Sequence, residues 1–110
     1  ALQAVDELEQ AGIGAVLLQN STPNHPDLAG HQAALAKTGG KLVTVEDHQL
    51  IGGAGSMLVS VLADAGTAVQ VERLGVDAAF GQSAYEAVEL YDKYGYGPQG
   101  MVAAAKRLAP

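Results

Sequence analysis

The 110 residues predict an α/β fold, a three-layer α/β/α sandwich with a mostly parallel sheet, formed as one domain. Two observations carry this prediction. Apolar, β-branched runs alternate with stretches of helical periodicity along the chain. The run Leu42 to Gly55, LVTVEDHQLIGGAG, also reads as a buried strand, a polar loop and the amino end of a helix. In open α/β sheets, ligands or partner subunits usually lie at that end of a strand.

The amino-terminal half should contain two helices and two strands. A helix over residues 1–11 carries apolar positions at helical spacing, and Gly12 ends it. Residues 13–19 form a short apolar run bounded by turn residues, which predicts a strand. Asp27 is suited to cap a second helix that ends at Gly39-Gly40, and the second strand should cover residues 41–46.

The carboxy-terminal half continues the alternation. A helix is expected over residues 56–65 and a third strand over 68–74. Ser83 followed by Glu86 is a capping box for a helix running to Tyr94. Pro98 then suits the first turn of a terminal helix. Three strands are few for a parallel sheet, and the chain opens directly in a helix, so we expect a fragment that lacks its first strand.

Composition excludes several functions. Six basic and twelve acidic side chains give a formal charge of −6, which argues against binding nucleic acid or an anionic membrane. The chain has no cysteine, hence no disulfide, thiolate zinc site or thiol nucleophile. Its apolar runs are too short to span a bilayer, and acidic residues near the amino end do not suit a signal peptide. We therefore expect a soluble, cytoplasmic domain.

Three segments carry a family resemblance: VTVEDHQLIGGAGS, RLGVDAAFGQS and YDKYGYGPQGMVAAAKRL. Together they resemble the carboxy-terminal domain of transketolase and its relatives, which include deoxyxylulose-phosphate synthase and the beta subunits of 2-oxoacid dehydrogenases. The resemblance extends from the first helix to Leu108, and FGQS followed by KYG resembles the transketolase branch most. Ala84 replaces a glycine that is frequent in the family. The family domain usually begins with a strand, which agrees with a truncated chain.

The resemblance implies that the complete enzyme uses thiamine diphosphate and magnesium and moves two-carbon ketol units between sugar phosphates. It places the cofactor and sugar contacts in upstream domains, and this chain has no GDG-type segment for magnesium and diphosphate. We therefore expect no catalytic, cofactor-binding or metal residue here. The expected partners are the upstream domains or a partner subunit, in a homodimer. Two alternatives remain: a stand-alone regulatory or nucleotide-binding module, and a 2-oxoacid dehydrogenase beta-subunit domain.

The strand-to-helix loop holds the candidate site, as either an interface or an anion-binding loop. Its members are Glu46, Asp47, His48, Gly52, Gly53, Gly55 and Ser56. Backbone N–H groups at a helix start favour anions, but the loop lacks the lysine of a P-loop and two carboxylates precede it. Glu46 and Asp47 are adjacent on an extended segment and should point to opposite sides, whereas Glu46 and His48 could share one. We therefore favour packing over acid–base catalysis.

The remaining candidates have structural explanations. His25, His31 and His48 lack metal-ligand spacing, so solvated or capping histidines are expected. Ser83 lacks a nucleophile elbow, and Asn20-Ser21-Thr22 reads as a turn rather than a glycosylation site. All five aromatic side chains lie near the carboxyl end, which predicts a half-exposed patch between domains or subunits. They are Phe80, Tyr85, Tyr91, Tyr94 and Tyr96.

Overall fold

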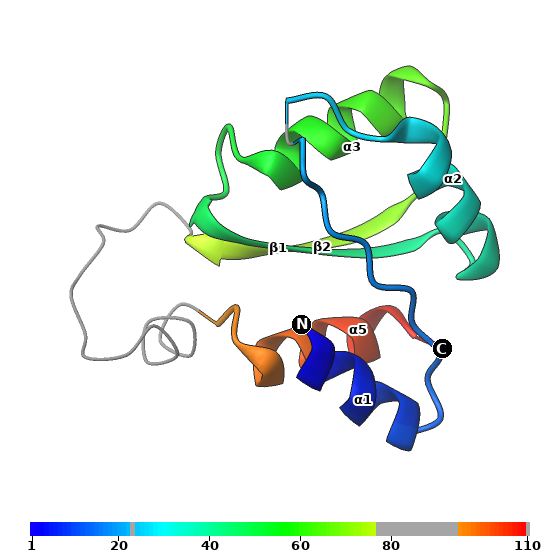
Figure 1. The fold of residues 1–110 in the computed structure, drawn as a ribbon, viewed down its shortest axis with the longest axis vertical. Helices are drawn as coiled ribbons and strands as arrows, with labels where there is room; N and C mark the ends of the chain where they lie inside the picture. The colour runs from blue at the N-terminus through cyan, green and yellow to red at the C-terminus, as the bar shows by residue number, and fades with distance from the viewer. Residues whose placement is uncertain (23, 77–94, 110) are drawn as a thin grey trace.

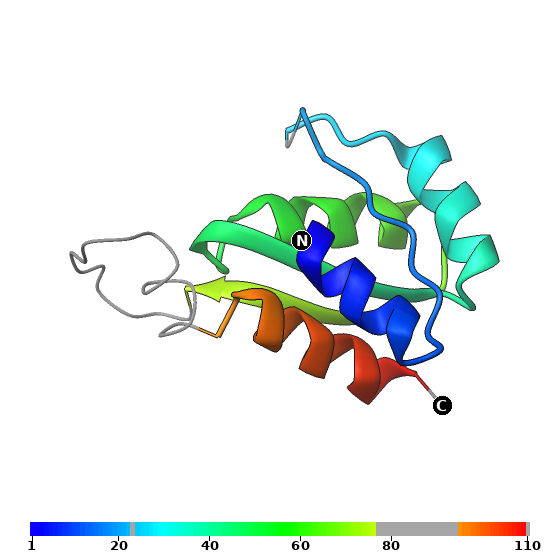
Figure 2. The same cartoon turned by 60° about the horizontal axis from the view of Figure 1, so that its bottom comes forward.

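The computed structural model describes residues 1–22, 24–76 and 95–109. Within them, four helices and a two-stranded parallel sheet form an α/β arrangement. The elements, in chain order, are α1 (Leu2–Gln10), α2 (Leu28–Lys37), β1 (Lys41–Gln49), α3 (Ala54–Asp64), β2 (Gln70–Val76) and α5 (Pro98–Leu108). Figure 1 shows α2 and α3 on one face of the sheet and α1 and α5 on the other, and the turned view in Figure 2 agrees.

Local signals in the sequence explain most element boundaries. The Asp27 carboxylate accepts a hydrogen bond from the Gly30 N–H at 3.1 Å, so it caps α2 as predicted. Gly39 and Gly40 follow α2 with positive φ angles, as expected where a helix ends and the chain turns. Pro98 lies in the first turn of α5, where its missing N–H costs nothing. The predicted helix from Ser83 to Tyr94 lies outside the described residues.

The two strands are parallel, but their register is irregular at one end. Lys41 pairs with Gln70, and pairing stays regular up to Val45 and Leu74. The next pair is Gln49 with Val76, so four steps along β1 match two along β2. Residues 46–48 therefore form a bulge, which redirects side chains relative to a regular strand. β1 is also longer than the predicted 41–46, so His48 belongs to the strand rather than to the loop.

The described core consists of two separate apolar clusters, one on each face of the sheet. Ala4 and Leu8 of α1 pack with Val102 of α5 on one face. Leu35 of α2 packs with Leu58 and Leu62 of α3 on the other. Two clusters are expected where helices cover both faces of a sheet, because the sheet lies between them.

One predicted strand is wrong in this structure. Residues 13–19 are extended but belong to neither strand of the described sheet. Val16, Leu17 and Leu18 are 48%, 45% and 44% exposed, although all three are strongly apolar. The local pattern predicts a strand, yet a strand also needs a neighbouring strand with which to pair. None of the described residues provides that neighbour for this segment.

Candidate functional site

The structure brings most of the predicted site residues together around the start of α3. Gly53 is the residue that precedes α3, and it has no side chain with which to cap the helix. The Gly55 N–H instead donates a hydrogen bond of 2.8 Å to Oε2 of Glu46, which reaches back from β1. A carboxylate at a helix amino end is stabilised by the helix dipole and by the exposed N–H groups. Glu46 therefore occupies the position that an external anion would take.

Two glycines make this close approach possible. A Cβ atom added to Gly53 would meet Oε1 of Glu46 and would lie 2.7 Å from the carbonyl oxygen of Gln49. A Cβ atom added to Gly55 would lie 2.6 Å from Oγ1 of Thr44. Contacts this short force a neighbouring atom to move. The glycines therefore have a packing role, since they allow α3 to lie against the end of β1.

Ser56 ties the loop to the second strand. Its hydroxyl donates to the carbonyl oxygen of Leu50 at 2.8 Å and accepts a hydrogen bond from Nη1 of Arg73 at 2.6 Å. The Leu50 N–H donates to the carbonyl oxygen of Val76 at 2.9 Å. These bonds link the loop, the first turn of α3 and both strands. Arg73 was not among the predicted site residues, because only the sheet pairing brings it to Ser56.

Asp47 points to the opposite side of the strand from Glu46, as its position on an extended segment predicts. Its Oδ1 accepts a hydrogen bond of 2.8 Å from the Tyr96 hydroxyl. Tyr96 is 3% exposed, so it is a buried contact within the chain rather than part of a half-exposed patch. The other members of the aromatic group lie outside the described residues. Glu46 thus links the end of β1 to α3, and Asp47 links it to the turn before α5.

The histidines do not gather around a common centre. Nδ1 of His48 donates to the Gln49 carbonyl oxygen at 2.8 Å, beside it in the chain. His31 is buried, and its Nδ1 donates to the Asp27 carbonyl oxygen at 2.6 Å in the first turn of α2. Across residues 1–22, 24–76 and 95–109, no group of three or more metal-ligating side chains could hold an ion. Of the helices in these ranges, none has the length and apolar character needed to cross a bilayer.

The only described salt bridge lies away from this loop. Arg107 of α5 donates two hydrogen bonds to Glu72 of β2, at 2.8 and 3.0 Å. The hydrogen bonds from Arg107 lower the pKa of the Glu72 carboxyl below its ordinary value, and the same contact raises the pKa of Arg107. The bidentate geometry fixes the orientation of α5 on the sheet. Because the pair is largely exposed, its contribution to stability is small.

The fold and this site define an α/β domain in which Oε2 of Glu46 caps the start of α3. Oε1 of Glu46 and Oγ1 of Thr44 are buried beside it without a hydrogen-bond partner among the described residues. Comparison with known proteins identifies the family of this domain. Residues 1–101 match the family model described as "Transketolase, C-terminal domain". The chain therefore belongs to the transketolase C-terminal domain family.

Relatives from two branches of this family are similar to the chain. It is 38% identical over 110 residues to a 1-deoxy-D-xylulose-5-phosphate synthase of Desulfitobacterium hafniense, covering 97% of the chain and 17% of that protein. It is 35% identical over 95 residues to a putative transketolase C-terminal section of Methanocaldococcus jannaschii, covering 86% of the chain and 28% of that protein. A solved "split gene transketolase, inactive beta4 tetramer" superposes with a TM-score of 0.83 and 31% identity, covering 97% of the chain and 33% of the other. The chain thus spans about a sixth to a third of these proteins.

Proposed function

We propose that this chain is the carboxy-terminal domain of a transketolase-like enzyme that transfers two-carbon ketol units between sugar phosphates. The family match over residues 1–101 supports this proposal. The observation that carries the domain's own role is the Glu46 contact, because it fills the helix amino end with a carboxylate of the same chain. In this proposal the domain packs against the upstream domains and helps to assemble a homodimer. Its loop residues hold the domain together and make no contact with the substrate.

Thiamine diphosphate and magnesium would supply the carbanion chemistry of such an enzyme. The described residues do not fit this cofactor. The amino end of α3, where a diphosphate would find N–H donors, faces the Glu46 carboxylate instead. The described side chains also include no cluster of metal ligands. The proposal therefore places the cofactor in the upstream domains, and no step of the reaction is assigned to this segment.

A second candidate within the family is formation of 1-deoxy-D-xylulose 5-phosphate. Two Desulfitobacterium hafniense proteins with that synthase name are each 38% identical to the chain over 110 residues. The transketolase section of Methanocaldococcus jannaschii is similar to nearly the same degree. The carboxy-terminal domain has the same assembly role in both candidates.

The alternative of a stand-alone anion-binding module has less support. An incoming phosphate would have to displace Glu46 from the Gly55 N–H and then lie beside a free carboxylate. Titration of the chain with inorganic phosphate or a nucleotide tests this alternative. We expect no saturable binding at millimolar ligand. Saturable binding that Glu46→Gln strengthens would favour the module.

The partners follow from the same proposal. One structural relative is described as a split-gene transketolase in an inactive beta4 tetramer. The name says that this tetramer is inactive. We propose that this chain acts together with upstream domains, whether these are in the same polypeptide or in a partner subunit.

The experiment that tests the proposed function uses the longer protein with and without residues 1–110. Both forms are assayed for ketol transfer between a ketose phosphate and an aldose phosphate, and for consumption of pyruvate with glyceraldehyde 3-phosphate. Their assembly is measured by light scattering. We expect deletion to abolish assembly and turnover, and addition of the separate segment to restore part of both. Full activity of the deleted form would contradict the proposal.

A further inference from the structure

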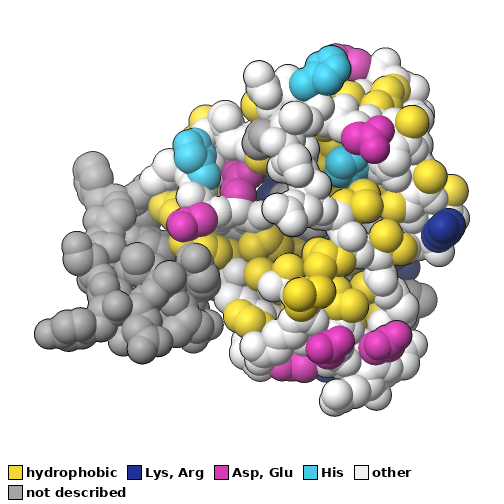
Figure 3. All heavy atoms as spheres, in the orientation of Figure 1, with side chains coloured by type: hydrophobic (Ala, Val, Ile, Leu, Met, Phe, Trp, Pro, Cys, Tyr) yellow, Lys and Arg dark blue, Asp and Glu magenta, His cyan; other side chains and the backbone are white. Residues whose placement is uncertain are grey.

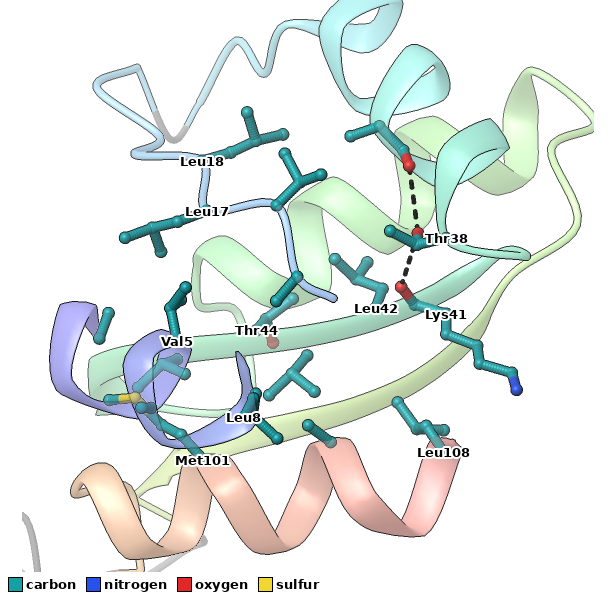
Figure 4. A pocket seen from close by; sticks show the side chains of 18 of the residues that line it. Val5, Leu8, Leu17, Leu18, Thr38, Lys41, Leu42, Thr44, Met101 and Leu108 are labelled. Atoms are coloured by element: carbon teal, nitrogen blue, oxygen red, sulfur yellow. Dashed lines mark hydrogen bonds between the residues drawn. The ribbon is translucent and has the colours of Figure 1, made fainter. Parts of the chain in front are cut away.

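No further inference is drawn: the strongest candidate, the apolar groove that residues 13–20 form with residues 41–46 of β1 (Figures 3 and 4), carries none, because nothing in the part of the chain that the structure describes shows what covers it.

Discussion

The loop between β1 and α3 contrasts with the apolar groove that residues 13–20 form with residues 41–46 of β1. In the loop, Glu46, Asp47 and Ser56 each have a hydrogen-bonding partner within the chain. In the groove, Val16, Leu17 and Leu18 are close to half exposed and belong to no strand of the described sheet. The loop contains the carboxylates and the hydroxyl that could act in catalysis, but these groups are hydrogen-bonded within the chain. The groove is mainly apolar and open, although Glu46 and Gly55 of the loop also line it. It is therefore the better candidate for an interface.

A substitution of Leu17 in the groove should have the largest effect on stability of the variants that test this contrast. In the longer protein, Leu17→Lys should lower the free energy of unfolding by about 2–4 kcal/mol if a partner surface covers the groove, because the new charge would then be buried. The matched control is Ile51→Lys, since Ile51 is 80% exposed and is not a lining residue of the groove. Denaturant unfolding measures both variants. If both variants cost less than about 0.5 kcal/mol, nothing covers the groove and it is not an interface.

Gly53 tests whether the loop is tightly packed. Gly53→Ala should destabilise the protein by about 1–3 kcal/mol, because the new Cβ would press against Glu46 and the Gln49 carbonyl oxygen. Gly14→Ala is the control from segment 13–20, where an added Cβ meets no atom within 4 Å. Thermal unfolding compares the two. Equal stability of both variants would show that the loop glycines have no packing role.

Tyr96 tests the link between the bulge and α5. Tyr96→Phe removes the hydroxyl that donates to Asp47 and should cost about 1 kcal/mol in the free energy of unfolding. Asp47→Asn retains an acceptor at the same place and should cost less. If the double variant costs as much as the sum of the single variants, the two side chains are not coupled.

Glu72 should show the smallest effect and a defined pH dependence. Because Arg107 lowers its pKa in the folded protein, the pair stabilises the fold above the ordinary carboxyl pKa of 4.5. That stabilisation is lost as the pH falls below 4.5 through the lowered value. The free energies of unfolding of the unchanged protein and of Glu72→Gln should therefore become equal as the pH is lowered from 7 to 3. The difference in free energy of unfolding between the two proteins should be small at neutral pH, because the pair is exposed. A difference that grows toward low pH would show that the Arg107 contact does not stabilise the ionised Glu72.

The sequence predicts those parts of the fold that depend on neighbours in the chain. The cap at Asp27, the glycines after α2 and Pro98 in α5 all determine element ends through local contacts. The strand prediction for residues 13–19 is wrong in this structure because a strand also depends on distant partners. The bulge at 46–48 was not predicted for the same reason, since it appears only in the register with β2.

In the candidate site, too, the sequence predicts local features but not the contacts between distant residues. The opposite orientations of Glu46 and Asp47 follow from strand alternation. Their partners do not follow from the local pattern, because Gly55 lies nine residues from Glu46 and Tyr96 lies 49 residues from Asp47. Tyr96 was predicted to belong to a half-exposed patch, yet it is buried against the bulge. An aromatic residue gives no local signal that separates these two outcomes.

The central claim is that the loop at residues 46–56 supports the structure and takes no part in the reaction. The most direct test is the kcat of Glu46→Gln and Asp47→Asn in the longer enzyme, each corrected for the folded fraction. We expect kcat within about threefold of the unchanged enzyme, because neither side chain touches the reacting atoms. Loss of a general acid or base typically lowers the rate by about 10²–10⁴-fold. A loss of that size in a fully folded variant would contradict the claim and place the loop in the active site.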